Sequence, residues 1–298
     1  MVTWACRLLV IAAASLAAAT SLAEEQSFDK RFNVQPGGHL TLDTDVGSVV
    51  VVGRDTQEVV IHAQMSDSDH LQITAEQNSS GVSVTGHVTQ HNWFDWFIFT
   101  SVHVRYTIDV PRNYPVELKT SGGSLDVRNL TASVEGKTAG GSITVRDVTG
   151  SIDMHTSGGS ITAERIKGTT KSRTSGGGID IDDSNGDLDV HTSGGGIDLK
   201  SIDGKVKADT SGGSIHAEVQ INRGVFLTTA GGSITLLLPE NARASIDAQT
   251  SGGRTESALP LSSTELAERS HLRGAINGGG ESIFLRTAGG SIHVEPLK

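Results

Sequence analysis

The chain has 298 residues, of which 36 are glycine and only 4% are aromatic, and its formal net charge at pH 7 is −10. An acidic chain without a cluster of Lys and Arg cannot neutralise phosphates, which argues against nucleic acid and against anionic lipid surfaces as partners. Because 36% of the residues are apolar and regularly placed, we expect a folded protein and not a low-complexity chain.

Residues 1–23 are typical of a secretory signal peptide. Arg7 precedes an apolar run from Leu8 to Ala19, and Ser21-Leu22-Ala23 fits the small-residue rule for cleavage. The run is shorter than the ~20 apolar residues of a bilayer span, so no integral membrane span is expected after cleavage. The single cysteine, Cys6, lies in this segment, which leaves the mature chain without disulfides. The segment predicts an exported protein, periplasmic or extracellular.

Residues 24–119 are expected to form an N-terminal β coil and capping strands. Thr44 to Val49 is a degenerate copy of a motif that recurs downstream. Leu40-Thr41-Leu42 and Val49 to Val52 predict a first coil, which Val59-Val60-Ile61 is expected to continue. Leu71 to Val84, with the turn Asn78-Ser79-Ser80-Gly81, predicts a hairpin. Phe97 to Val110 alternates as one long strand before Pro111.

Residues 120–253 contain a regular repeat with a period of 18 residues. The four residues Thr-(Ser/Ala)-Gly-Gly begin at Thr120, Thr138, Thr156, Thr174, Thr192 and Thr210, and with looser spacing at Thr229, Thr250 and Thr287. A period this short and regular predicts one supersecondary unit stacked on copies of itself.

The positions of one repeat, counted from its first Thr, predict two short strands. Positions six and eight are apolar and alternate with polar residues, position fifteen is mostly apolar, and glycine occupies positions three, four and thirteen. Eighteen residues at ~3.3 Å each cannot run straight and repeat, so the chain must coil, with equivalent residues stacked ~4.8 Å apart. The prediction is an all-β, single-stranded parallel β-solenoid, right-handed by the general preference of parallel crossovers.

Two columns of the repeat test this register. Position sixteen contains Glu135, Asp153, Lys171, Asp189 and Lys207, whose charges alternate from Asp153 onward, as expected of vertical neighbours. The Thr at position one has the parity of position fifteen, so its hydroxyl is expected to point inward and to bond the corner backbone.

Residues 254–276 interrupt the array, and residues 277–298 are expected to form a terminal coil. Ser262, followed three residues later by Glu265, fits a capping box, which predicts a short helix through Leu272.

These features resemble the bacterial putative adhesin family, a β-strand-repeat domain of unknown function that also includes LiaG-like envelope proteins. The resemblance is carried by the repeated Thr-Ser-Gly-Gly-(Ser/Gly)-Ile, by the strand ending Tyr106-Thr-Ile-Asp-Val-Pro111, by Gly274-Ala-Ile-Asn-Gly-Gly-Gly and by Leu285-Arg-Thr-Ala-Gly-Gly-Ser-Ile292. It covers Phe28 to Val294. The resemblance implies a β-solenoid in the cell envelope and implies no reaction, because the family has no established catalytic residues.

Two constellations are candidates for chemistry or binding. Asp180, Asp198 and His216 share position seven on successive repeats, and stacked carboxylates beside an imidazole suit acid and base catalysis on a polysaccharide. Outward charges of this kind are more often solvated surface. The cluster Trp93, Phe94 and Trp96 concentrates aromatic surface and is either an exposed contact loop or a cover over the end of the core.

Metal sites and an ice-binding face are disfavoured. A calcium roll needs Asp at every turn, whereas Thr144 and Thr162 occupy position seven elsewhere, so at most one weak site near Asp180 and Asp198 is left. His155 and His191 are separated by Arg173 in their column, ~10 Å apart, which prevents joint ligation. The regular Thr column is expected to face inward, away from ice.

The sequence therefore predicts an exported, non-enzymatic β-solenoid, with no cofactor and no metal, that serves as a cell-envelope scaffold or an adhesin-like interaction module. Its partner is expected to be a protein or carbohydrate of the envelope, held by weak contacts repeated along the tube. The alternative is a polysaccharide-acting hydrolase or lyase of the parallel β-helix type that uses Asp180, Asp198 and His216.

Overall fold

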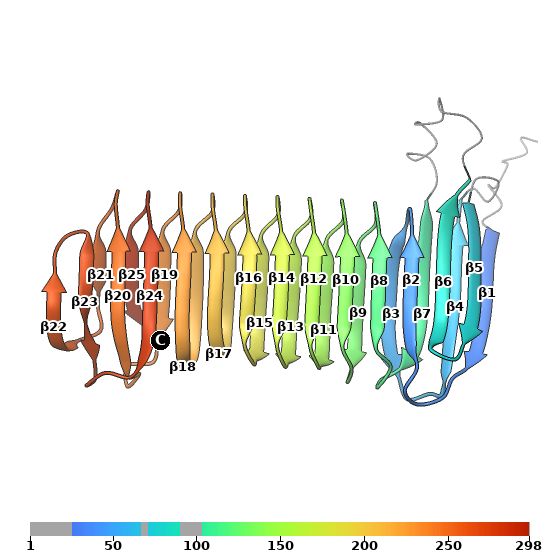
Figure 1. Cartoon of the computed structure of the whole chain (residues 1–298), viewed down its shortest axis with the longest axis horizontal. Helices are drawn as coiled ribbons and strands as arrows, with labels where there is room; N and C mark the ends of the chain where they lie inside the picture. Colours follow the sequence, from blue (N-terminus) through green and yellow to red (C-terminus); the bar gives the residue numbers. More distant parts are fainter. Residues whose placement is uncertain (1–25, 67–70, 90–102, 298) are drawn as a thin grey trace, which may run out of the picture.

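The computed structural model describes residues 26–66, 71–89 and 103–297. These residues form 25 β-strands in one hydrogen-bonded sheet, with no helix among them. The sheet is folded into two faces that enclose a continuous apolar core, and the result is a long, flattened tube (Figure 1). The expected all-β class is confirmed.

The two faces, here called face I and face II, are joined by two long strands, β17 (Ile197–Thr210) and β18 (Ile215–Thr229), which contribute their first halves to face I and their second halves to face II. Face I contains, in spatial order, β1 (Gln26–Asn33), β4 (Glu58–Met65), β7 (Val104–Pro111), β3 (Ser48–Arg54), β9 (Leu125–Leu130), β11 (Ile143–Thr149), β13 (Ile161–Lys167), β15 (Ile179–Asn185), β17, β18, β19 (Ile234–Leu238), β25 (Ile292–Pro296) and β21 (Thr255–Ser257).

Face II contains, in spatial order, β5 (Leu71–Asn78), β6 (Gly81–Val88), β2 (His39–Thr44), β8 (Val116–Thr120), β10 (Val134–Thr138), β12 (Ile152–Thr156), β14 (Thr170–Thr174), β16 (Leu188–Thr192), β17, β18, β24 (Glu281–Thr287), β20 (Ala244–Thr250), β23 (His271–Ile276) and β22 (Leu261–Ala267). The pairings of the array are parallel, whereas both ends contain antiparallel pairs. The fold is therefore solenoid-like but mixed, and a single parallel solenoid describes only its middle.

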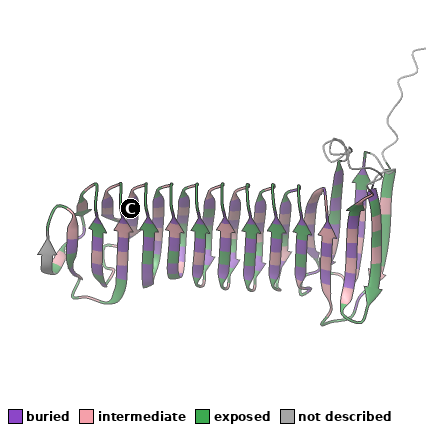
Figure 2. Cartoon of the chain, turned by 45° about the horizontal axis from the view of Figure 1, so that its top comes forward, coloured by how far each residue is buried: buried purple, intermediate pink, exposed green. Residues whose placement is uncertain are grey.

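The predicted register holds along the array. Ile143, Ile161, Ile179 and Ile197 are successive partners in parallel pairings, so they form one file inside the tube. Burial alternates along the strands, as Figure 2 shows, because every second side chain points into the core. Each buried Ile, Leu or Val stabilises the tube by about 1.5–3 kcal/mol.

Glycine at position four is required by the closeness of the coils. A Cβ on Gly141 would lie 2.1 Å from the carbonyl oxygen of Gly123, the equivalent residue of the preceding coil. Position thirteen has a second reason, because Gly168 and Gly186 have φ of +137° and +144°, a region that glycine enters without strain.

The Thr file joins each coil to the one before it. The hydroxyl of Thr192 is fully buried, donates to the carbonyl oxygen of Gly177 at 2.7 Å and accepts from the amide of Gly195 at 3.3 Å. The same pair of bonds recurs at Thr138, Thr156, Thr174, Thr210, Thr229, Thr250 and Thr287. The expected inward position of these hydroxyls is confirmed.

Both ends depart from chain order. The coil formed by β24 and β25 lies between the coil of β18 and β19 and the coil of β20 and β21 (Figure 1). At the other end, β2 and β3 are covered by β6 and β7. The degenerate motif is in register with the array, since Thr44 stacks on Thr120. The described part of the expected terminal coil, residues 277–297, is thus an inner coil and not the last one.

Two expectations for the ends are wrong. Residues 261–276 form the antiparallel pair β22–β23 and not a short helix, and the hydroxyl of Ser262, expected to cap that helix, donates to the carbonyl oxygen of Ala275 and accepts from the amide of Gly278. Pairing with β23, which itself pairs with β20, outweighs a local capping signal. Val59 to Ile61 lie in β4, which is antiparallel to β1 and β7 and does not continue the first coil.

The hairpin predicted at Leu71 to Val84 is confirmed as β5 and β6, whose turn is held by bonds from the amides of Ser80 and Gly81 to the side chain of Asn78. The long strand expected from Phe97 is described from Val104 onward, and the part before residue 103 lies outside the described residues.

Candidate functional site

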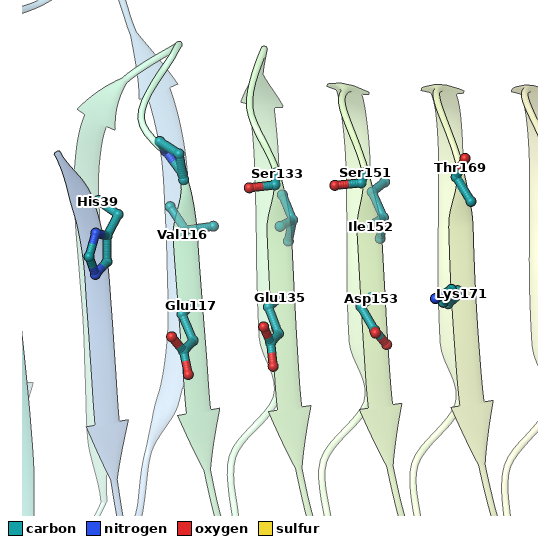
Figure 3. A pocket seen from close by; sticks show the side chains of 12 residues that line it. His39, Val116, Glu117, Ser133, Glu135, Ser151, Ile152, Asp153, Thr169 and Lys171 are labelled. Atoms are coloured by element: carbon teal, nitrogen blue, oxygen red, sulfur yellow. The ribbon is translucent and has the colours of Figure 1, made fainter. Parts of the chain in front are cut away.

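A shallow groove crosses five neighbouring strands of face II, β2, β8, β10, β12 and β14, near the point where each strand begins. Its volume is about 510 Å³. Small hydroxylated side chains at position fourteen line it in one row, and charged side chains at position sixteen line it in a second row (Figure 3). The lining side chains used below are Ser133, Ser151 and Thr169 at position fourteen and Glu117, Glu135, Asp153 and Lys171 at position sixteen.

The groove is a direct product of the register. Glu117, Glu135 and Asp153 are successive partners in the pairings of β8, β10 and β12, so three carboxylates follow one another at ~4.8 Å per coil. Figure 3 shows them in one row across the strands. Lys171 ends the row on β14, and His39 on β2 lies at the opposite end of the groove.

A neighbouring cation, Lys137, reduces the repulsion between these carboxylates. Lys137 forms an ion pair with Glu135 at 2.5 Å, and this contact raises the pKa of the Lys137 ammonium above its ordinary value. On the next strand, Lys119 is held by Asp43 at 2.9 Å. The groove therefore presents a row of carboxylates, beside two lysines, Lys119 and Lys137, that are each bound to an acidic side chain.

Position sixteen continues beyond the groove with alternating charge. Lys171 pairs in register with Asp189, and Asp189 with Lys207. The predicted alternation from Asp153 onward is confirmed. The sequence interpretation missed the carboxylate that precedes the first regular repeat, Glu117, and the small residues of position fourteen. Both could have been found from the sequence, because position fourteen has hydroxyl side chains in successive repeats and position sixteen, two residues later, has three successive acidic residues.

Asp180, Asp198 and His216 lie on face I, as successive partners at position seven on β15, β17 and β18. The predicted stacking is confirmed. His216 Nε2 lies 3.4 Å from Glu218 Oε1, and Asp198 is bound by Lys200 at 2.7 Å. These contacts run along each strand and not between the three residues.

The electrostatics of this file concern mainly Asp180. Burial, followed by the nearby charge of Asp198, raises the pKa of the Asp180 carboxyl above its ordinary value, while Lys200 acts in the opposite direction. Asp180 is nevertheless solvent-exposed, so the effect is screened. Asp180, Asp198 and His216 thus form a row of stacked polar side chains on the outer surface of face I.

The aromatic cluster of Trp93, Phe94 and Trp96 lies outside the described residues. Among the residues that the structure does describe, no group of three His, Cys, Asp or Glu side chains is placed to hold a metal ion. No helix in the same part of the chain is long and apolar enough to cross a membrane.

Comparisons with known proteins concern nearly the whole chain. A family model described as Toastrack DUF4097 matches residues 38–295. Similar solved structures include a putative adhesin from Bacteroides fragilis, 12% identical, with 92% of this chain and 99% of that chain covered and a TM-score of 0.42. A putative adhesin from Parabacteroides distasonis is 12% identical, with 92% and 98% covered and a TM-score of 0.47.

A putative lipid binding protein, also from Parabacteroides distasonis, is 10% identical, with 91% of this chain and 97% of that chain covered and a TM-score of 0.47. A comparison with curated proteins found no match.

Proposed function

Because the chain belongs to the Toastrack DUF4097 family, we propose that it is an exported, non-enzymatic interaction module of the cell envelope, scaffold-like or adhesin-like. Its partner is an extended carbohydrate or protein that lies along the tube and contacts equivalent side chains on successive coils. Export rests on the signal-like residues 1–23.

The observation that carries this proposal is the register of the outward side chains. Ser133 and Ser151 directly precede the neighbouring strands β10 and β12 of face II, and Glu135 and Asp153 follow them in direct pairing. One coil therefore repeats the contact surface of the coil before it, at ~4.8 Å. A linear partner with a similar repeat meets the same kind of group several times.

Repeated contacts give affinity without a deep pocket. If each coil adds about 1.4 kcal/mol, the dissociation constant falls tenfold per coil. The backbone of the tube is held by ladders and by the Thr file, so the surface is preorganised and little entropy is lost on binding. Weak single contacts are thereby combined into specific binding.

The absence of a reaction is part of the proposal and is supported by the geometry of face I. Asp198 is held by Lys200 and His216 by Glu218, and a flat outward ladder does not exclude water from a reacting bond. The alternative, a polysaccharide hydrolase or lyase, requires turnover that depends on Asp198. Product formation by the wild type that is lost in Asp198→Asn would contradict the proposal.

The binding test uses two triple variants with the same change of charge on opposite faces. Glu117→Gln, Glu135→Gln and Asp153→Asn neutralise the groove. Asp180→Asn, Asp182→Asn and Asp198→Asn remove three negative charges from face I, where Asp182 lies on β15 two residues after Asp180, and serve as the matched control. We expect the wild type and the control to retain the same envelope component in a pull-down, and the groove variant to lose it. Equal retention by both triple variants would contradict the role of the groove.

A further inference from the structure

A second surface on face II, nearer the C-terminal end of the tube, contains two aromatic side chains on neighbouring coils. Phe226 on β18 and Phe284 on β24 are direct partners in a parallel pairing at position sixteen. Phe226 is 36% exposed and Ile221 is 49% exposed, and these two are the large hydrophobic side chains exposed among the described residues. In a chain with 4% aromatic residues, an outward aromatic pair is costly surface.

Charged side chains of both signs surround the two rings. Lys205 Nζ lies 5.5 Å from the centre of the Phe226 ring, and the guanidinium carbon of Arg286 lies 4.2 Å from the centre of the Phe284 ring. Arg286 is fixed in this place by Asp247, whose Oδ1 lies 3.0 Å from the Arg286 nitrogen. The arrangement is rigid because a ring and a carboxylate hold the same guanidinium.

Asp247 stays ionised in this setting. Burial acts to raise the pKa of its carboxyl, but the hydrogen bond from His271, at 3.1 Å, and the charge and hydrogen bond of Arg286 outweigh it and hold the pKa below the ordinary value. Asp247 therefore orders Arg286 and His271 together at the edge of the aromatic pair.

A hollow of about 460 Å³ lies two residues further along the same strands, at position eighteen, and Arg286, which packs on Phe284, is part of its lining. Its polar lining includes His191, Asp209, Thr228 and Arg286, and the rest is formed by the corners of the coils. The volume is within the ~300–1,000 Å³ range of small-ligand sites, which combine apolar surface with a few placed polar groups.

We propose that this surface, defined by Phe226, Phe284 and the hollow lined by Asp209 and Arg286, binds a neutral saccharide. One sugar ring packs on the exposed face of Phe226, and its hydroxyls bond to the carboxylate of Asp209, the hydroxyl of Thr228 and the guanidinium of Arg286. The inference goes beyond the proposed function and does not require the groove at Glu117 to Asp153.

The charges on this surface favour a neutral ligand. Lys205, Lys207 and Arg286 are interleaved with Asp209 and Asp247, so a polyanion or a polycation meets repulsion together with attraction. Sugar hydroxyls both donate and accept hydrogen bonds and can use groups of either charge. A protein partner is disfavoured by size, because a stable interface takes about 800 Å² from each partner, and the apolar part here is two rings.

The test is saturation-transfer NMR with defined oligosaccharides on the mature chain. The neutral probes are cellohexaose, xylohexaose, mannohexaose and maltohexaose, and the charged probes are an alginate hexamer and a chitosan hexamer. Each is used at about 5 mM, above the ~1 mM Kd expected of one shallow site. We expect saturation transfer to at least one neutral probe, and a titration then gives the wild-type Kd.

Phe226→Ser and Asp209→Asn are each expected to weaken that binding tenfold or more, whereas Ile221→Ser, which removes the other exposed apolar side chain, leaves it unchanged. Thermal melting by circular dichroism confirms that each variant is folded, and the isosteric Asp209→Asn keeps the test valid if Phe226→Ser melts early. The inference is overturned by no transfer to any neutral probe, by transfer to charged probes alone, or by wild-type affinity in Phe226→Ser and Asp209→Asn. Such a result leaves envelope retention through the groove intact, so the two proposals fail separately.

Discussion

The close stacking of glycine at position four makes a quantitative prediction, because two neighbouring glycines differ in how near a Cβ would come to the backbone of the preceding coil. In Gly141→Ala, the new methyl group would lie 2.1 Å from the carbonyl oxygen of Gly123, 2.4 Å from its carbonyl carbon and 2.6 Å from the amide nitrogen of Ser124. In Gly140→Ala it would lie 3.8 Å from the carbonyl oxygen of Ser121. Neither glycine has a positive φ, so backbone strain does not separate the two variants.

The overlap in Gly141→Ala involves backbone atoms of a paired strand corner and cannot be relieved by a side-chain rotation. Overpacking in a core costs about 1–3 kcal/mol, and backbone overlap on this scale is expected at the upper end of that range, ~3 kcal/mol or more. Gly140→Ala is expected to be neutral or to stabilise by about 0.4–1 kcal/mol, because alanine reduces the entropy of the unfolded chain.

The assay is urea unfolding followed by circular dichroism, with the slope compared between variants to detect loss of cooperativity in a repeat protein. A difference of less than about 0.5 kcal/mol between the two variants would refute the reasoning, since that is the usual effect of an unremarkable surface change.

Three further changes test the core and the electrostatics. Ser184 is buried without a hydrogen-bond partner, and the equivalent residue of the next coil is Ile202. Ser184→Ile is therefore expected to raise the free energy of unfolding in urea by about 2 kcal/mol. A lower free energy of unfolding would show that the core has no room for the larger side chain. Thr192→Val should destabilise by about 1–3 kcal/mol through its two lost bonds, with Thr192→Ser closer to wild type in the same assay. The raised pKa of Asp180, caused by burial and by Asp198, means that the folded state binds the proton more tightly than the unfolded state. Asp180→Asn should therefore raise the melting temperature at pH 7, with the gain shrinking below about pH 4, and a gain independent of pH would contradict this cause.

The regular middle of the fold could be predicted because its information is local and repeated. Parity places Ile143 and Ile161 inside, the period places one above the other, and the Thr and Gly corners follow from the same count. An atypical residue in one repeat is recognised by comparison with the equivalent residues of the other repeats. The residue types at one position of all repeats therefore predict burial better than the sequence of a single coil does.

The ends could not be predicted in the same way, because their partners are distant and do not repeat. Nothing in the period places β24 between β18 and β20, yet this insertion brings Phe284 beside Phe226. The surface formed by Phe226 and Phe284 was missed for that reason. Ser262 and Glu265 gave a helix signal that lost to the pairing of β22 with β23.

The left-handed backbone conformation at position ten could be predicted from the sequence for only some of the repeats. Asn129, Asp147 and Asp183 tolerate the φ of about +55 to +61° found there, but Arg165 and Ser201 adopt φ of 55° and 54° as well. Arginine and serine do not favour this conformation, so the residue types at position ten did not indicate a shared positive φ. The stacking of the coils enforces the corner at all five positions.

The central claim, that successive coils present equivalent contacts to one extended partner, is tested most directly by removing whole coils. Deletion of residues 139–156 joins Thr138 to Ser157, keeps the register and removes Ser151 and Asp153 from the groove, whereas deletion of residues 175–192 removes one coil outside it. With the envelope component retained by the wild type as the ligand, we predict about a tenfold weaker Kd for the first deletion and no change for the second. Equal affinities of the two deletion variants would contradict the claim.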